Sequence, residues 1–331
     1  MAEVFYDKDA DLSVLKGLTV GVLGYGNQGR AWALNLRDSG VTVVVGNVRD
    51  EYWGKAEKDG FKVLDLDEAS AVADLICLLL PDEVQPVVYR EHVEGNLDEG
   101  KMLVFAHGFS IRYGLIKPPG FVDVALAAPR MIGSGVRRLY ELGLGAPAFL
   151  AVKQDYTGEA WGRLLALAKA LGFTRVGALK SSFEEETELD LFTEQAVMPV
   201  IIAAFMKAYE ILSETGYSPE AIALELLASG ELIEMFRQVC KRGLIGQLPL
   251  HSRTSQYGQL SRTRRFLKLI EDAMRLSLNE IRSGSFSAEW VSEQKGGYVR
   301  FRKLMEDALN HPLCHAEARV KDKVKIPYDL L

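Results

Sequence analysis

Three glycines with G-x-G-x-x-G spacing, Gly24, Gly26 and Gly29, directly follow a short apolar run at residues 19–23. The first glycine of such a turn allows a sharp passage from strand to helix. The second lets the backbone approach a pyrophosphate, and the third lets helix and strand pack closely. A helical pattern and a second apolar run follow, which favours a dinucleotide site over a plain glycine-rich turn. The predicted cofactor-binding residues of this turn are Gly24, Tyr25, Gly26, Asn27, Gln28 and Gly29.

The second predicted strand ends at the position that usually meets the adenosine ribose, and Arg49, Asp50 and Glu51 follow it. An acidic side chain there accepts a hydrogen bond from a free 2′-hydroxyl and repels a 2′-phosphate. Asp50 and Glu51 therefore favour NADH over NADPH, whereas Arg49 is also able to grip a phosphate. The alternative is that the two acids only begin a helix, where they complement its dipole.

Polar residues also follow the next two predicted strands. Leu80, Pro81 and Asp82 come after one strand, beside the expected cofactor cleft, and His107 comes after the other. His107 lies at the carboxyl edge of the sheet, where open α/β folds bind ligands, so it is a candidate general acid/base or substrate donor. The alternative is a plain loop histidine. We expect Asp82 to be a helix N-cap rather than a catalytic group.

Two carboxylates, Asp190 and Glu194, are spaced i, i+4 where an acidic run becomes apolar. This spacing places both on one face of a helix. Such a pair suits a hard cation such as Mg²⁺, which takes oxygen ligands. Spacing alone is equally typical of a solvated surface.

These residues need a frame of alternating strands and helices, which the first half provides. A change near residue 181 predicts two domains, a Rossmann-type dinucleotide-binding domain at 1–181 and an all-helical domain at 182–331. Pro199 is expected to kink or break its helix. Strands of a parallel sheet are predicted at 19–23, 42–45, 75–79, 102–105, 123–127, 148–152 and 174–177, and helices at 159–171, 189–215, 219–242, 262–282 and 288–309.

The bulk composition sets limits on function. The chain has 331 residues and a formal net charge of −6, which disfavours a general nucleic-acid or membrane-surface binder. Its three cysteines are widely spaced, so they indicate neither a disulfide framework nor a zinc ribbon. No signal peptide and no membrane-spanning apolar run is evident, so we expect a cytoplasmic protein with a small-molecule substrate.

Taken in order, several motifs resemble those of the ketol-acid reductoisomerase family, at the length of its short form. Residues 252–258 resemble a diverged form of the family's Ser-Asn-Thr-Ala-Glu-Tyr-Gly segment. The closer motifs are Gly-Tyr-Gly-Asn-Gln-Gly at 24–29, Leu-Leu-Pro-Asp-Glu at 79–83, Phe-Ala-His-Gly-Phe at 105–109 and Glu-Thr-Glu-Leu-Asp-Leu-Phe-Thr-Glu-Gln-Ala-Val at 186–197.

The resemblance implies a reaction and roles for its residues. The family rearranges a 2-acetyl-2-hydroxy acid by Mg²⁺-assisted alkyl migration and reduces the product with a nicotinamide cofactor, a step of branched-chain amino acid biosynthesis. By resemblance, Asp190 bridges two metal ions, Glu194 completes one site and Glu225 serves the other. Ser252 contacts the substrate carboxylate, and His107 stands near the nicotinamide and substrate.

Two further features are implied only by the resemblance. The second domain is expected to be knotted and to form a homodimer or higher homo-oligomer. The loop after the second strand is short and acidic, as in members that look suited to NADH.

The chain also departs from the family pattern. Arg130 stands in place of the active-site Lys, in Pro-Arg-Met-Ile-Gly-Ser at 129–134, where Gly133 is expected to bind cofactor. Arg is planar and always charged, so the change is not conservative at a tight site. Ser229 replaces a second helical Glu, and Gln256 replaces the Glu before Tyr. Together these positions leave open whether one or two Mg²⁺ ions bind.

Three functions remain open from the sequence. The first is a reductoisomerase with an altered site that involves His107, Arg130, Glu194 and Ser252. The second is a family member that has lost isomerisation and reduces another 2-keto acid or a related carbonyl or imine. The third is a non-catalytic dinucleotide-binding protein, which the intact glycine turn disfavours.

Overall fold

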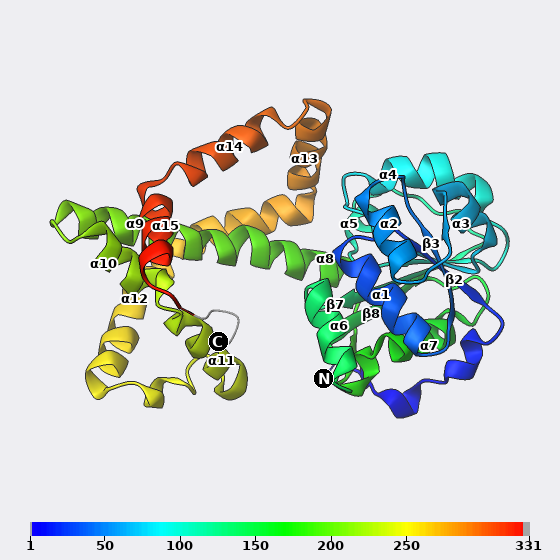
Figure 1. Ribbon diagram of the computed structural model, residues 1–331, viewed down its shortest axis with the longest axis horizontal. Coiled ribbons are helices and arrows are strands. Elements are labelled where there is room, and N and C mark those ends of the chain that lie inside the picture. Colours follow the sequence, from blue (N-terminus) through cyan, green and yellow to red (C-terminus); the bar gives the residue numbers. More distant parts are fainter. Residues whose placement is uncertain (1, 327–331) are drawn as a thin grey trace. The chain divides into compact units, whose positions relative to one another are not determined.

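The structure is a computed structural model that describes residues 2–326, and it divides into two compact units (Figure 1). The first unit ends at Leu189 and the second begins at Asp190. The first is an α/β unit of the Rossmann type and the second is helical. Helix α8, Phe183–Phe192, contains the division point. The domain boundary near residue 181 and the knot stay predictions.

Within the described residues, nine strands form one sheet of the first unit, in the order β1-β9-β8-β7-β6-β5-β2-β3-β4. From β2 the chain passes to β3 on one side, whereas β5 pairs with β2 on the other, so the order reverses between β2 and β5. Open α/β sheets bind ligands at such a reversal, outside the carboxyl ends of the strands. The strands are β1 Val4–Phe5, β2 Thr19–Leu23, β3 Thr42–Gly46, β4 Val63–Leu64, β5 Leu75–Leu78, β6 Met102–Phe105, β7 Asp123–Pro129, β8 Ala148–Gln154 and β9 Ala178–Lys180.

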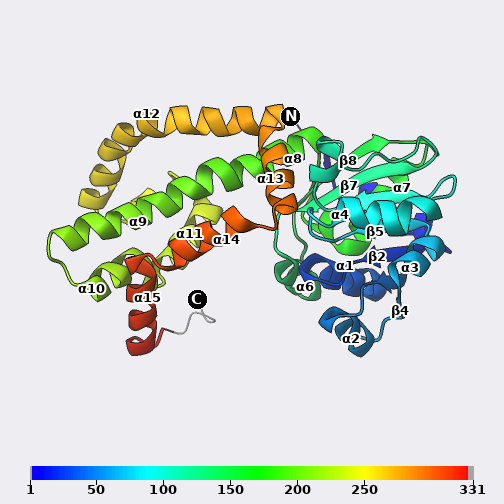
Figure 2. The same cartoon turned by 90° about the horizontal axis from the view of Figure 1, so that it is seen from above.

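Helices cover both faces of this sheet, as Figures 1 and 2 show. Helices α1 and α7 pack on the face to which Leu75 and Cys77 of β5 point, whereas α3 packs on the face of Ile76 and Leu78. Apolar residues therefore fill both faces of the central strands, as burial on both sides requires. The helices are α1 Asn27–Asp38, α2 Glu51–Lys58, α3 Leu66–Val72, α4 Gln85–Val88, α5 Phe109–Arg112, α6 Gly133–Glu141 and α7 Ala160–Leu171, with short 3₁₀ or π turns at Asp7–Asp9, Leu12–Leu15, Tyr89–Val93, Glu94–Asn96 and Phe173–Arg175.

The predicted all-parallel sheet is wrong, because β7 pairs with β8 and β1 pairs with β9 in antiparallel fashion. Pro129, the last residue of β7, lies opposite Ala148, the first residue of β8. The segment between them contains α6, which packs against α1. After α6 the chain comes back to the same edge of the sheet, beside β7. No crossover takes place, so β8 runs back along β7.

The predicted strand at 174–177 is also wrong. Gly172 has a φ of +84° and ends α7, and a 3₁₀ turn, η5 (Phe173–Arg175), follows. Gly177 has a φ of +104°, and β9 begins only after it. The two short strands β1 and β4 have too few residues to give a sequence pattern.

The second unit is helical, as predicted, but several helices have other bounds. Gly230, with a φ of +80°, interrupts the predicted helix at 219–242, and Gly297 with Tyr298 interrupts the one at 288–309. Helix α12 begins nine residues before the prediction, because Ser252 caps it. The elements are α9 Met198–Glu214, α10 Pro219–Ala223, α11 Glu231–Arg242, α12 Arg253–Ser283, α13 Ser285–Lys295, α14 Val299–Leu309 and α15 Pro312–Lys323, with π turns η6 (Thr193–Val197) and η7 (Leu224–Ala228) and a 3₁₀ turn η8 (Leu248–Leu250).

The predicted disruption at Pro199 takes the form of the π turn η6, directly before the proline. Proline has no N–H to donate to the carbonyl four residues earlier, which here belongs to Gln195. The Ser277 hydroxyl of α12 donates to that carbonyl over 3.2 Å. The turn thus keeps the helix continuous while its backbone acceptor is satisfied from a neighbouring helix.

One continuous helical segment, Phe183–Glu214, is long and apolar enough to cross a membrane by length and composition. The expectation that no run reaches this length is therefore wrong. Its most apolar stretch has a mean hydropathy of 1.6 and is mostly exposed. Length and composition alone are weak grounds for a membrane span, because apolar helices that pack against protein also have them.

Candidate active site

The glycine turn has the geometry that a bound pyrophosphate requires. Gly24 has a φ of +95°, and a Cβ there would lie 2.9 Å from the Leu79 carbonyl oxygen. A Cβ on Gly29 would lie 1.8 Å from the Gly24 carbonyl oxygen. A Cβ on Gly26 meets nothing within 4 Å, so the backbone faces open space at this point. The residues therefore fit a dinucleotide whose pyrophosphate approaches the start of α1.

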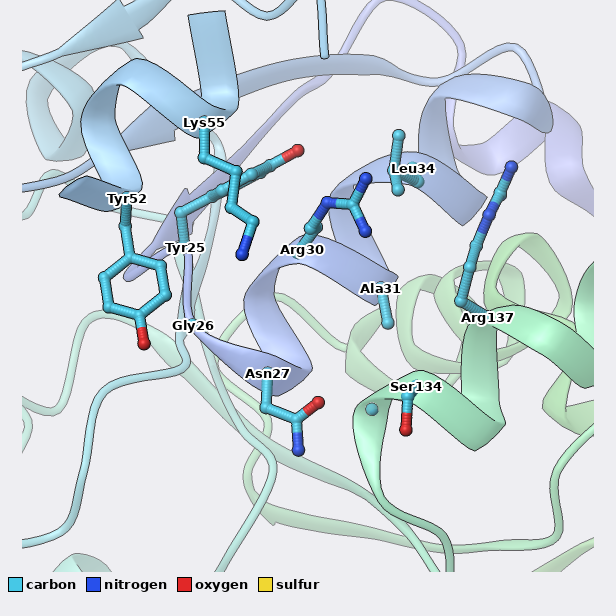
Figure 3. A pocket seen from close by; sticks show the side chains of 11 residues that line it. Tyr25, Gly26, Asn27, Arg30, Ala31, Leu34, Tyr52, Lys55, Ser134 and Arg137 are labelled. Atoms are coloured by element: carbon cyan, nitrogen blue, oxygen red, sulfur yellow. The ribbon is translucent and has the colours of Figure 1, made fainter. Parts of the chain in front are cut away.

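A pocket of about 290 Å³ lies beside this turn (Figure 3). Figure 3 shows that its lining residues come from the glycine turn and from α1, α2 and α6. The approach of α6 is close, because a Cβ on Gly133 would lie 1.9 Å from the Asn27 carbonyl oxygen. Gln28 also donates to the Met131 carbonyl over 2.9 Å. The lining residues are Tyr25, Gly26, Asn27, Arg30, Ala31, Leu34, Tyr52, Lys55, Gly133, Ser134 and Arg137.

A network around Asp59 supports one wall of the pocket. The Arg30 guanidinium donates to both Asp59 oxygens, at 2.6 and 3.1 Å, and the Tyr25 hydroxyl donates to Oδ2 over 2.9 Å. The bond from Arg30 holds the pKa of Asp59 below its usual range. Burial, and then the bond to Asp59, raise the pKa of Tyr25. Tyr25 therefore remains a neutral phenol at physiological pH.

The loop after β3 shows a capping role for Asp50. Its Oδ1 accepts the backbone N–H of Tyr52 at 2.9 Å and of Trp53 at 3.3 Å, so Asp50 is the N-cap of α2. Glu51 is exposed in the first turn. The Arg49 guanidinium lies 4.7 Å from the centre of the Trp53 ring. The structure thus shows the helix-initiating role, and binding of the ribose stays a prediction for these residues.

His107 and Asp82 form a hydrogen-bonded pair at the carboxyl edge of the sheet. Leu78 and Phe105, the last residues of β5 and β6, lie opposite each other, which brings the two following loops together. The Nδ1 of His107 is 2.7 Å from Oδ2 of Asp82. The prediction of Asp82 as an N-cap is wrong, because α4 begins at Gln85 with Val84 at its N-cap. An ionised carboxylate accepts the Nδ1 proton, which fixes the ring and its tautomer.

Leu80 and Pro81 shape the loop that carries Asp82. The Leu80 carbonyl accepts the Gln85 side-chain amide over 2.8 Å, and the Pro81 carbonyl accepts the backbone N–H of Val84 and Gln85. These bonds fold the loop back on itself, close to the end of β5. Their effect is to hold Asp82 in place beneath His107.

Arg130 is paired with a carboxylate that sequence reasoning did not select. Its Nη2 lies 2.8 Å from Oε1 of Glu186, a fully buried side chain. The Gly108 N–H donates to the other Glu186 oxygen over 2.8 Å. The guanidinium also lies 5.1 Å from the centre of the Phe149 ring. These contacts fix the plane of the guanidinium, so Arg130 presents a permanent, oriented positive charge.

The remaining candidate residues lie in the second unit. Asp190 is in α8 and exposed Glu194 is in the π turn η6. Glu225 is exposed in the second π turn, η7. Ser252 caps α12 and accepts the Ser255 N–H over 3.2 Å. The carboxylate oxygens of this set are the donors that Mg²⁺ prefers, so its chemistry fits that ion.

Ser229 stands where the family has a second helical glutamate, so this position has no carboxylate. The Ser229 Oγ accepts the Glu231 N–H over 3.3 Å, at the start of α11. Glu234 accepts hydrogen bonds from Arg237 and Gln238. The Gln256 amide donates to the His251 carbonyl over 2.7 Å. These side chains support helix starts rather than a carboxylate cluster.

Both parts of the chain match models of one family. Residues 14–177 match the domain described as "Acetohydroxy acid isomeroreductase, NADPH-binding domain", and residues 183–326 match "Ketol-acid reductoisomerase, C-terminal domain". The chain belongs to the ketol-acid reductoisomerase family. The members of this family are oxidoreductases, and the match covers both units.

Similar proteins agree with this assignment. "Ketol-acid reductoisomerase (NADP(+))" of Methanopyrus kandleri is 46% identical over 316 residues, which cover 95% of each chain. The protein of the same name from Caldivirga maquilingensis is 44% identical, again over 95% of each chain. A solved structure of an NADH-preferring ketol-acid reductoisomerase from an uncultured archaeon has a TM-score of 0.92 and 36% identity. It covers 98% of this chain and is itself covered completely.

Family membership confirms the recognised motifs and the fold class. The structure brings the glycine turn together with Gly133, and His107 together with Asp82. Sequence reasoning missed Asn47, Lys55 and Glu186. Asn47 directly follows Gly46 at the end of a strand, and that position could have marked it as a site residue. Nothing in the sequence distinguished Glu186 from the acids beside it.

Proposed function

We propose that this chain is a ketol-acid reductoisomerase with an altered active site, which uses NADH and Mg²⁺ in the cytoplasm. The observation that carries the proposal is the His107–Asp82 pair, which lies at the carboxyl ends of β5 and β6, beside the strand that carries the glycine turn. This edge is where the fold binds its cofactor and substrate. NADH is favoured because Asp50 and Glu51 follow β3, and one similar structure is titled NADH-preferring.

The chemistry divides between the bound groups and the side chains. When bound, Mg²⁺ polarises a carbonyl and stabilises an alkoxide, and the nicotinamide supplies a hydride. Asp82 holds Nδ1 of His107, so that Nε2 is the nitrogen that exchanges a proton with a substrate oxygen. Arg130 attracts the anionic substrate with a fixed charge, and Ser252 donates to its carboxylate. The proposed metal ligands are Asp190, Glu194 and Glu225.

The second unit supports a second copy of the chain as part of this site. Glu225 follows Ala223, which packs in one apolar cluster with Tyr209 of α9. Tyr209 is about 20 Å along the helix from Glu194, at roughly 1.5 Å per residue. Magnesium binds its ligands at roughly 2 Å, and Asp190 would bridge the two ions, so Glu194 and Glu225 would both have to lie within a few ångströms of those ions, which this separation within one chain does not allow. In a dimer, the partner chain could provide Glu225 beside Asp190 and Glu194 of the first chain.

The exposed apolar surface of the second unit agrees with a dimer. Soluble monomers rarely expose large contiguous apolar patches. Here α9 and α14 carry exposed Ile202, Ile211, Leu304 and Leu309. A second copy would cover these side chains.

A second candidate function is a reductase that has lost the migration step. It is favoured by Ser229, whose hydroxyl accepts the Glu231 N–H at the start of α11, where the family has a metal-binding carboxylate. Arg130 supports it as well, because it replaces a lysine with a group that stays charged. Such an enzyme would reduce a 2-keto acid or a related carbonyl.

One assay separates the two functions. Purified protein with Mg²⁺ is given NADH and either 2-acetolactate or 3-hydroxy-3-methyl-2-oxobutanoate, the rearranged keto acid. Oxidation of NADH with both substrates supports the reductoisomerase. Oxidation with the second substrate alone supports the reductase. Oxidation with neither, while NADH still binds, contradicts the reductoisomerase and places any reductase substrate outside these two compounds.

A further inference from the structure

Asn47 is a buried polar residue between the two parts of the predicted cofactor site. It directly follows Gly46, the last residue of β3, and is 5% exposed. Leu23 of β2 lies opposite Gly46, so Asn47 and the glycine turn leave the sheet side by side. An amide at this depth must be hydrogen-bonded, and its partners define what it holds.

On one side the amide contacts the glycine turn. Its Oδ1 accepts the backbone N–H of Tyr25 over 3.1 Å. Tyr25 stands between the first two glycines of the motif. The Asn47 side chain is therefore fixed relative to the backbone on which the pyrophosphate would rest.

On the other side the amide contacts Asp50. Its Nδ2 donates to Oδ1 of Asp50 and to the Val48 carbonyl, each over 2.8 Å. Together with the two backbone N–H groups of α2, this gives Oδ1 of Asp50 three donors. A carboxylate with this many donors to one oxygen has a fixed plane. Oδ2 is then the oxygen that can accept a bond from a ligand.

The guanidinium of Arg49, the cation next to Asp50 in the sequence, contacts other residues. Arg49 stacks on Trp53 and lies 3.7 Å from Asp65. Its charge is therefore partly balanced within the chain, whereas the three donors to Oδ1 of Asp50 are neutral. The loop thus carries an oriented anion at the strand end where such folds bind the adenosine ribose.

We propose that Asn47 is a positioning residue for cofactor choice, which holds the Asp50 carboxylate in register with the glycine turn. Oδ2 then accepts the 2′-hydroxyl of NADH and repels the 2′-phosphate of NADPH. This inference rests on the proposed function, because it requires a nicotinamide dinucleotide at the glycine turn. It adds a residue that does not touch the cofactor itself.

The test is the ratio of the NADPH and NADH dissociation constants, measured by fluorescence titration of the full chain with each reduced cofactor. Asn47→Leu keeps the branching and the number of side-chain heavy atoms and removes all three side-chain hydrogen bonds. Without them Asp50 turns away, so we expect NADH to bind more weakly and NADPH to bind no worse. The ratio should fall about tenfold or more, as the loss of one charge-assisted hydrogen bond predicts.

Asp50→Asn provides the matched background. It keeps an oxygen for the helix cap but removes the charge, so it should lower the ratio by itself. If Asn47 acts through Asp50, then Asn47→Leu has no further effect on the ratio in this background. Thermal unfolding of each variant monitors the fold. Asn47→Ser, a smaller side chain that lacks the amide and its three hydrogen bonds, carries the same expectation.

Three results overturn the inference. One is that Asn47→Leu weakens both cofactors by the same factor, which would mean that the amide supports only the turn or the fold. Another is that Asn47→Leu lowers the ratio by the same factor in the wild-type and the Asp50→Asn background. The third is a wild-type chain that binds both cofactors equally. A wild-type chain that binds neither cofactor instead contradicts the proposed function.

Discussion

At the residue scale, two carboxylates fix the basic side chains of the candidate site. Asp82 lies 2.7 Å from His107, and the fully buried Glu186 lies 2.8 Å from Arg130. The sequence showed that His107 and Arg130 stand at strand ends, but not which acids pair with them. Those pairs depend on which loops the sheet order makes neighbours, and strand order is not a local property of the chain.

The first prediction concerns Asp82. Asp82→Asn places an amide against Nδ1 of His107 and weakens the preference for one tautomer, so turnover should fall about tenfold to a hundredfold. Cofactor affinity should change little, because the substitution acts on the histidine. Steady-state kinetics and NADH titration measure the two effects. Unchanged turnover would show that His107 takes no part in the rate-limiting step.

A second prediction concerns the pH dependence of stability at Asp59. Because its pKa is lowered in the folded state, the ionised side chain stabilises the fold above its usual pKa of about 4. That contribution is lost as the pH falls through the lowered value. Asp59→Asn should therefore cost about 1 kcal/mol at neutral pH and progressively less below about pH 4.

Urea unfolding at several pH values measures this cost. Asp98→Asn is the matched control, because Asp98 is exposed and lies 4.0 Å from its nearest cation. It should have little effect at any pH. A penalty at Asp59 that is constant with pH would argue that the charge is not the stabilising part of the network.

At the element scale, the sequence predicted what local spacing controls. The glycine turn, six of the seven predicted strands and helix α7 appear within a few residues of their predicted places. The mixed pairing of β7 with β8 was not predictable, because it depends on α6 packing against α1. Likewise, Gly230 ends a helical pattern only because its backbone takes a positive φ.

The third prediction tests how closely α6 must approach α1. In Gly133→Ala the new Cβ would lie 1.9 Å from the Asn27 carbonyl oxygen, so α6 must move. We expect a loss of about 2 kcal/mol or more in the free energy of unfolding and weaker cofactor binding. Urea unfolding and NADH titration measure both.

The matched control for this change is Gly54→Ala, also in a helix. A Cβ on Gly54 meets nothing within 4 Å, so alanine should stabilise α2 by roughly 0.5–1 kcal/mol. Equal effects of the two substitutions would contradict the close packing of α1 and α6.

At the scale of the whole molecule, the proposed dimer rests on the separation of Glu194 and Glu225 along the second unit. Glu194→Gln and Glu225→Gln should each abolish most of the activity. Subunits of the two variants, mixed and allowed to exchange, should regain about a quarter of it, because half of the dimers then contain one intact site. Activity assays before and after exchange, with chain mass measured in solution, provide the test.

The matched control is a mixture of Glu194→Gln with a chain that carries both substitutions. No site in that mixture is intact, so it should stay inactive. Failure of the first mixture to regain activity, although the subunits exchange, would mean that each chain forms its site alone.

The most direct test of the central claim follows the hydride itself. The purified chain with Mg²⁺ is given 2-acetolactate and NADH deuterated at C4 of the nicotinamide, and the product is analysed by mass spectrometry. We predict 2,3-dihydroxy-3-methylbutanoate with deuterium at C2, the carbon that becomes a carbonyl only after methyl migration. Loss of NADH without labelled product, or no reaction while NADH binds, would contradict the assignment of reductoisomerase activity to this chain.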